Sequence, residues 1–414
     1  MNGETKPDVA RRQFLSAATG LLLLKPQTVR GFQANSAVRV GLLGCGGRGA
    51  VDATSIAANG PARIVALADL FEDRLAAAKE RFADVAPSQM FHGPRAAEQI
   101  VASREVDAVV IATPPYFHPE HLAMAVAAGK HVYCEKPVAV DVPGAMRAVE
   151  TGKQAEGRVS LEVGFQIRKA PPFVELVRRI HAGALGEICC AEAHYFCPFL
   201  TLPDYPQASA AELRLRHWVR DRVLSGGVIV EQNIHVIDVC NWVLQSHPVR
   251  AMGTGGRKGR SEQGDCWSHY DVVFDYPNGV QLSFSSTQFG KGGYDVNERF
   301  FGTRGNSSSP YAGPLRIAGD QPWIWAGSET PQNGAFSQTG SFTDNLAQAD
   351  AEKHADFVES IVTGKYHNQA ALGAESALSA MLGRTAAYDG NVAAWDELLR
   401  STEVWDAGID IAKL

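Results

Sequence analysis

The chain has 414 residues, of which 45% are hydrophobic, 20% charged and 8% aromatic, and this composition excludes a collagen-like, coiled-coil or broadly disordered protein. The length suffices for about two or three domains with sizeable cores. The formal net charge of −6 argues against a nucleic-acid-binding protein, which needs a basic surface. Seven cysteines are an odd number without a Cys-x-x-Cys pair, so we expect buried free thiols rather than disulfides or a zinc ribbon.

Residues 1–35 have the pattern of a twin-arginine export signal. Arg11 and Arg12 precede a mostly apolar run from Phe14 to Leu24, which is too short to span a bilayer. We therefore expect a periplasmic or otherwise exported protein with no membrane span in its mature part. The twin-arginine pathway transports folded proteins, often with a cofactor already bound.

The next segment predicts a dinucleotide-binding domain at 36–157. An apolar run at 37–43 suits a buried parallel strand, and a G-x-G-x-x-G motif follows it, as in the turn that carries a pyrophosphate. A helix at 50–58 would offer its N-terminal amides to the phosphates, and strand 63–68 precedes Asp69. An acid there binds the adenosine ribose and disfavours a 2′-phosphate, so NAD is favoured over NADP. The motif supplies the cofactor-binding candidates Gly44, Gly46, Gly47, Arg48 and Gly49.

Strands and helices continue to alternate through this domain. Strand 107–112 leads into Thr113-Pro114, a helix is expected at 119–128, and strand 131–134 leads into Glu135-Lys136-Pro137. This alternation predicts a parallel sheet, whose ligands bind at the carboxyl ends of its strands. Further cofactor-binding candidates are therefore Thr113, Pro114, Glu135 and Lys136, together with His118, which we expect to pack behind the first of these loops.

Beyond about residue 158 the pattern becomes rich in strands, which predicts an α+β second domain at 158–414. The segment 319–345 is rich in Gly, Ser, Gln and Thr and is expected to be a long loop or lid near the substrate cleft. Strands are expected at 188–196, 249–253, 269–276 and 280–288, a hairpin turn at 276–279, and helices at 346–363 and 370–390.

One further segment, 228–244, has the pattern of a single helix that is apolar almost all round and hence buried. It nevertheless carries Glu231, His235 and Asp238, which spacings of four and three residues place on one face. Buried ionisable groups need hydrogen-bond or ion-pair partners, or have a functional role. From these residues alone, a core histidine satisfied by Glu231 and a functional histidine are equally open.

Taken in order, these motifs resemble those of the Gfo/Idh/MocA oxidoreductase family. The resemblance covers nearly all of the chain after the signal segment, and it implies an N-terminal Rossmann domain and a C-terminal domain built on a large, mostly antiparallel sheet. That sheet often pairs with its twin in the family, so we expect a dimer or tetramer. The resemblance is carried by GCGGRG at 44–49, ALAD at 66–69, ATPPYFH at 112–118, AGKHVYCEKP at 128–137, VGFQIR at 163–168, SGGVIVEQNIHVIDVCNWV at 225–243, FGTRG at 301–305 and KHADFVESIVTGK at 353–365.

The resemblance also implies catalytic roles. In the family the lysine of Glu-Lys-Pro reaches the substrate oxygen and the nicotinamide ribose, and here it is Lys136. The helix that faces the nicotinamide commonly carries Asp-x-Gly-x-His; here Glu231 and Asn233 stand for the acid and the glycine, and His235 matches the general acid/base. We expect His235 to take a hydroxyl proton while Lys136 stabilises the alkoxide, with Glu231 beside them.

Segments that border the cleft in relatives supply candidate substrate contacts. A polyhydroxylated ligand needs several polar donors and an aromatic platform. The histidines show no recognisable metal-ligand spacing, so no metal is predicted. The candidates are Arg168, Tyr195, Trp218, Arg220 and Asp238, with His194, Arg216 and His217 on the same segments.

Three functions follow from these expectations. The first is an exported NAD-dependent oxidoreductase that acts on a carbinol of a sugar, inositol or related polyol and retains its cofactor, because soluble nicotinamide is scarce outside the cytoplasm. The second is a glycoside hydrolase that uses NAD transiently, by oxidation, elimination and re-reduction, as some relatives do. The third is a non-catalytic sugar- or cofactor-binding protein. Product analysis separates the first two, since only the hydrolase releases a free sugar and its leaving group.

Overall fold

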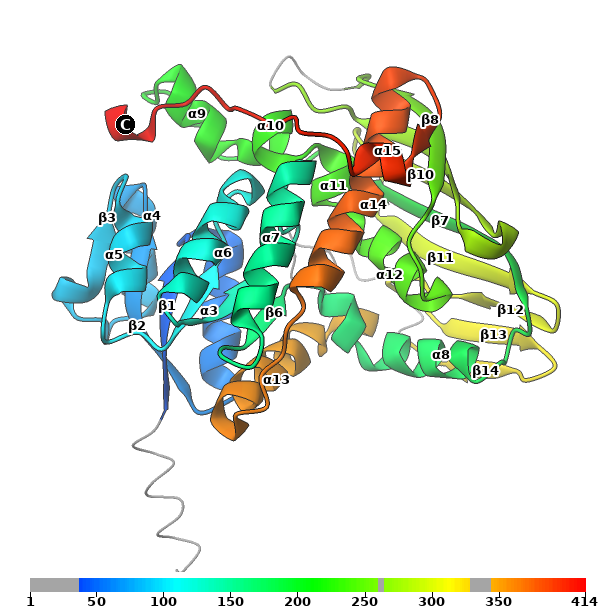
Figure 1. The fold of residues 1–414 in the computed structure, drawn as a ribbon, viewed down its shortest axis with the longest axis horizontal. Coiled ribbons are helices and arrows are strands. Elements are labelled where there is room, and N and C mark those ends of the chain that lie inside the picture. The colour runs from blue at the N-terminus through cyan, green and yellow to red at the C-terminus, as the bar shows by residue number, and fades with distance from the viewer. Residues whose placement is uncertain (1–36, 260–263, 328–343) are drawn as a thin grey trace, which may run out of the picture.

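The computed structural model describes residues 37–259, 264–327 and 344–414, and two sheets organise them, one in each half of the chain (Figure 1). The expected signal segment at 1–35 lies outside these ranges. In the part that is described, no single helix is long and apolar enough to cross a membrane. Residues 222–231 and 234–244 meet those criteria only as a pair bent by 49°.

The first sheet has six parallel strands in the order β3-β2-β1-β4-β5-β6, which confirms the predicted Rossmann-type architecture. Its four central strands are the apolar runs expected from the sequence, because a strand covered on both faces needs a nearly continuous apolar sequence. The strands are β1 (Val38–Leu43), β2 (Ala62–Asp69), β3 (Met90–His92), β4 (Ala108–Ile111), β5 (His131–Cys134) and β6 (Leu161–Val163).

Helices cover both faces of this sheet. The last of them begins where the Asp141 side chain accepts the Gly144 N–H at 2.7 Å, with a proline in the first turn, a typical helix start. The helices are α3 (Gly47–Ala58), α4 (Glu72–Arg81), α5 (Ala96–Ala102), α6 (His118–Ala127) and α7 (Val142–Ala155).

The second sheet has nine strands in the order β14-β13-β12-β11-β7-β10-β9-β8-β15. Only the β7–β10 pair is parallel among the strand pairs of this sheet in the described ranges, so the expectation of a mostly antiparallel sheet is confirmed. The strands are β7 (Ile188–Cys197), β8 (Arg250–Gly256), β9 (His269–Asp275), β10 (Gln281–Gln288), β11 (Asp295–Gly302), β12 (Gly305–Ser308), β13 (Leu315–Gly319), β14 (Trp323–Trp325) and β15 (Ala393–Ala394).

One face of the nine-stranded sheet is covered by α8, α12 and α14, while Figure 1 shows no helix of the described residues on the opposite face. The helix α13 leaves this half of the molecule and packs against α3 of the first. The helices of the second half are α8 (Pro171–His181), α9 (Ala210–Arg216), α10 (Arg222–Ser225), α11 (Val228–Glu231), α12 (Ile234–Leu244), α13 (Ala349–Thr363), α14 (Ala370–Asp389) and α15 (Trp395–Leu398).

The prediction of one continuous helix at 228–244 is wrong. The segment is divided into α11 and α12, because the carbonyl oxygen of Val228 accepts the N–H of Gln232 and also that of Asn233, both at 3.0 Å. The second bond spans five residues, and such an insertion bends a helix. Glu231 therefore lies before the bend and His235 after it.

Two other expectations are corrected. Within the segment expected to be a loop or lid, Trp323–Trp325 forms β14 at the sheet edge, and 328–343 lies outside the described residues. None of the seven cysteines forms a disulfide, as expected, but Cys189 and Cys190 are both exposed instead of buried. The β7–β11 register shifts at this point, and a bulge lets neighbouring residues face the same way.

Candidate functional site

A cavity of about 370 Å³ lies at the carboxyl ends of β1, β2, β4 and β5, where an open α/β sheet binds its ligands. The loops after these strands form one wall, and segments near α9, α11 and α12 form the other. The predicted site residues that line it are Gly44, Gly46, Gly47, Arg48, Asp69, Thr113, Pro114, His118, Glu135, Lys136, Tyr195, Arg216, Trp218, Glu231 and His235.

The glycine turn has the shape that a pyrophosphate site requires. Gly44 has φ +94°, and a Cβ atom there would lie 2.6 Å from the backbone of Ala112. Gly49 lies behind the lining, and a Cβ atom on it would lie 2.1 Å from the carbonyl oxygen of Gly44. A larger residue at 44 would push the turn away from the end of β4, and one at 49 would push α3 off the turn. The residues present therefore fit a dinucleotide whose phosphates approach the N-terminus of α3.

Asp69, at the end of β2, joins the glycine turn to the following loop. Its carboxylate accepts the N–H of Cys45 at 2.7 Å and the N–H of Phe71 at 2.9 Å. Burial raises the pKa of Asp69. Each carboxylate oxygen has a further lone pair, and the side chain lines the cavity, so it can still accept a bond from a ribose hydroxyl.

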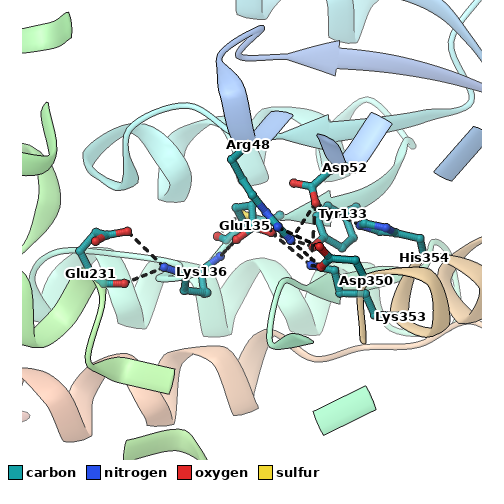
Figure 2. A network of polar contacts seen from close by, with 10 residues as sticks. Arg48, Asp52, Tyr133, Glu135, Lys136, Glu231, Asp350, Lys353 and His354 are labelled. Atoms are coloured by element: carbon teal, nitrogen blue, oxygen red, sulfur yellow. Dashed lines mark hydrogen bonds and ion pairs between the residues drawn. The ribbon is translucent and has the colours of Figure 1, made fainter. Parts of the chain in front are cut away.

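Arg48 lines the cavity, but its guanidinium is bound within the protein (Figure 2). It contacts Glu135 at 3.1 Å, Asp52 at 2.9 Å and Asp350 at 2.8 Å. Lys353, which is 1% exposed, lies 3.0 Å from Asp350, 3.4 Å from Glu135 and 3.8 Å from Asp52. We call Arg48, Asp52, Glu135, Asp350 and Lys353 the buried charge cluster.

The buried charge cluster keeps Glu135, the residue before Lys136, ionised. Although burial opposes it, the positive charges of Arg48 and Lys353 hold the pKa of Glu135 well below its usual value. The ionised Glu135 accepts the backbone N–H of Lys136 at 3.2 Å. The cluster thus connects the glycine turn, the Glu-Lys-Pro loop and α13.

Lys136, Glu231 and His235 meet at the cavity. The Lys136 Nζ atom donates to the Glu231 carbonyl oxygen at 2.7 Å and to its carboxylate at 3.1 Å (Figure 2). Burial, and then the charge of Lys136, lowers the pKa of His235 well below its usual value, so the imidazole is neutral. Glu231 is bound to Lys136, and among the described residues the Nδ1 atom of His235 has no hydrogen-bond partner. His235 is therefore not a core histidine whose hydrogen bond is supplied by Glu231.

Five predicted substrate contacts lie outside the cavity lining, namely Arg168, His194, His217, Arg220 and Asp238. Arg168 and Asp238 form a bidentate ion pair with distances of 2.8 and 2.9 Å, and Ser376 also donates to Asp238 at 2.7 Å. The bend at residues 232–233 removes Asp238 from the face of Glu231, which corrects the expectation of one shared face. Arg220 donates to the carbonyl oxygen of Leu200 at 2.8 Å and stacks on a phenylalanine. Arg168, Asp238 and Arg220 join elements of the cavity wall.

His118 connects the two strand-end loops. Its ring nitrogens lie 2.7 Å from the carbonyl oxygens of Thr113 and Pro137, and the residue also takes part in the cavity lining. Sequence reasoning missed other residues of the lining, of which Phe71 and Arg74 follow Asp69 by two and five residues. Their position shortly after Asp69, the expected ribose-binding acid, could have indicated that they line the cavity. His121 is also in the lining, and its Nδ1 atom lies 3.0 Å from the Thr113 hydroxyl.

The chain matches two family models. Residues 38–163 match the model described as "Oxidoreductase family, NAD-binding Rossmann fold", and residues 173–308 match the "GFO/IDH/MocA C-terminal domain". Together the two matches cover more than half of the chain and include both walls of the cavity.

Individual relatives agree with these matches. An inositol 2-dehydrogenase of Rhizobium meliloti (strain 1021) is 28% identical over 283 residues, which are 68% of this chain and 78% of the relative. The fold resembles that of a levoglucosan dehydrogenase solved with NADH and levoglucosan, with a TM-score of 0.68, 20% identity, and coverage of 86% of this chain and 99% of that one. It also resembles an aldose-aldose oxidoreductase from Caulobacter crescentus, with a TM-score of 0.67, 18% identity, and coverage of 86% and 99%.

Proposed function

Because this chain belongs to the Gfo/Idh/MocA family of NAD-binding oxidoreductases, we propose that it oxidises a carbinol of inositol, a sugar or a related polyol. One observation carries the proposal. Lys136 and His235 come from different halves of the chain and line the same cavity as the glycine turn. The similarity to an inositol 2-dehydrogenase over 68% of this chain supports a polyol as substrate.

The chain's own residues would act as base and electrostatic stabiliser. Bound NAD supplies the hydride acceptor at this site. His235 accepts the hydroxyl proton, since its lowered pKa keeps the imidazole neutral. The ammonium of Lys136 stabilises the negative charge that develops on the substrate oxygen, and Glu231 orients that ammonium through the 3.1 Å contact. The same groups return a proton when a ketone is reduced.

The experiment that tests this function starts from the full chain purified without added nucleotide. The denatured protein is analysed by mass spectrometry for NAD, NADH and NADP, and the native protein is mixed with inositols, sugars and glycosides. We expect bound NAD(H), reduced-nicotinamide fluorescence with a polyol, and a ketone product. Free sugar released from a glycoside without net oxidation would instead identify the hydrolase, and binding without any conversion would identify a binding protein.

We further propose that the chain is exported by the twin-arginine pathway with NAD already bound. The Arg11-Arg12 pair and the apolar run at 14–24 support this. In fractionated cells, the wild-type chain should appear outside the cytoplasm, whereas Arg11→Lys/Arg12→Lys should remain inside. Equal export of that variant contradicts the proposal.

The assembly that we propose is a dimer or tetramer formed through the uncovered face of the nine-stranded sheet. Met252 and Val392, which are 46% and 52% exposed, add apolar surface near that face. Sedimentation velocity measures the mass directly, and a monomeric mass contradicts this assembly.

A further inference from the structure

Residues of the second half reach over the first half at the end of the cavity near Asp69. In Figure 1, α9 and the C-terminal tail run side by side above the strand ends of the first sheet. From this region Leu202, Leu215, Arg216 and Ile411 line the cavity together with Asp69. The side expected to hold the adenosine is thus bounded by two segments that are remote in sequence from the Rossmann strands.

Arg216, the last residue of α9, makes the principal polar contact between these parts. Its guanidinium binds Asp73 through two bonds of 2.9 and 3.0 Å and binds Glu212 at 2.7 Å. The bond from Arg216 lowers the pKa of Asp73. Asp73 lies in the first turn of α4, four residues after Asp69, so this pair joins the second half to the helix that follows the ribose-binding acid.

The same guanidinium is held between two aromatic rings. It lies 4.0 Å from the ring centroid of Phe71 and 4.4 Å from that of Tyr205, and the Arg216 side chain is only 10% exposed. Phe71 also lines the cavity. A planar cation that is stacked and bidentate at once has few other orientations available, so this contact is specific in geometry.

Apolar packing surrounds the contact. Leu215, Leu224 and Ala407 are buried together, and the side chains packed on them come from Rossmann loops, from the α9 region and from the tail. Arg214 donates to the carbonyl oxygen of Ala407 at 2.8 Å, which ties the tail to α9.

We propose that Arg216, Asp73, Phe71 and Tyr205 form an interdomain latch that retains NAD by closing the adenosine side of the cavity. The inference rests on the proposed function, because it presumes a dinucleotide in this cavity. Departure of the adenosine past α9 requires the Arg216–Asp73 pair and its ring stack to open. Retention also constrains the reaction cycle: the two electrons and two protons lost by one carbinol must pass to a second carbonyl compound that enters the same cavity.

The test measures exchange of bound cofactor rather than turnover. Full-length protein loaded with NAD is mixed with excess isotopically labelled NAD, and mass spectrometry follows the replacement with time. We expect slow exchange in the wild type and about tenfold faster exchange in Arg216→Gln and in Asp73→Asn. The double variant should exchange no faster than Arg216→Gln, because that single variant already removes the contact with Asp73 together with the ring stack. Arg216→Lys keeps the positive charge but loses the planar guanidinium that binds both carboxylate oxygens of Asp73. Its exchange rate should therefore lie between those of the wild type and Arg216→Gln.

Arg178→Gln is the matched control, since it breaks an exposed Arg–Glu pair on α8 that lies outside the cavity lining. Circular dichroism and a urea transition establish that each variant is folded. Exchange as slow in both folded latch variants as in the wild type overturns the latch alone. A wild-type chain that binds no dinucleotide overturns the proposed function, and the latch with it.

Discussion

Replacement of Lys136 by methionine is expected to lower kcat/KM for the polyol by about 10²–10³-fold while NAD stays bound. The ammonium is held at the cavity by the carbonyl and carboxylate oxygens of Glu231 at 2.7 and 3.1 Å. Methionine keeps the length of the side chain but cannot stabilise an alkoxide. Steady-state rates give the loss in kcat/KM, and mass spectrometry of the denatured variant shows whether NAD is retained.

The pH profile adds a second readout to this substitution. The oxidation rate falls as pH drops through the pKa of His235, because only the neutral imidazole accepts a proton. After burial, the charge of Lys136 is the main cause that lowers this pKa. Lys136→Met should therefore move the acid limb of the remaining activity to higher pH. Lys153→Met, on the exposed surface of α7, is the control. Wild-type kcat/KM in Lys136→Met would exclude an electrostatic role.

Replacement of Lys353 by methionine is expected to destabilise the chain by about 3–5 kcal/mol. Lys353 is 1% exposed and lies within 4 Å of three carboxylates, those of Asp52, Glu135 and Asp350. Its loss leaves these acids with Arg48 as the remaining cation of the buried charge cluster. Urea unfolding without nucleotide, followed by circular dichroism, measures the change in the free energy of unfolding.

Two further variants identify the cause. Lys365→Met removes an exposed lysine just beyond α13 and should change the free energy of unfolding by less than about 0.5 kcal/mol. Adding Asp52→Asn to Lys353→Met removes one of the three carboxylates that share Arg48 and should recover part of the loss. A loss below about 1 kcal/mol in Lys353→Met would mean that water or neighbouring groups compensate the buried acids.

The first sheet was predictable because its central strands are short, apolar and bounded by glycine or proline loops. The same runs placed Thr113, Lys136 and Asp69 at strand ends, and these residues line one cavity in the structure. Short, partly polar edge strands such as Met90–His92 gave no comparable signal.

Contacts between remote segments could not be predicted in this way. Arg48 was expected at the phosphates because of its place in the motif, but its guanidinium binds Asp350, which is 302 residues away. The bend after Glu231 depends on one backbone carbonyl that accepts two N–H groups, and helical spacing alone cannot reveal it. The partners of Arg168 and Arg216 likewise lie 70 and 143 residues away.

Because α13 packs against α3, the first half cannot complete its packing until α13 has been synthesised. Synthesis completes β1 to β6 long before α13 exists, so the nascent Rossmann sheet lacks Lys353, which contacts Asp52 and Glu135. An N-terminal fragment ending at residue 163 would also lack Phe357 and Val358, which are fully buried in the hydrophobic core of the first half. Stable folding of the first half therefore requires almost the whole chain to have been synthesised. A truncation before α13 is expected to destabilise the first half as well as the second half.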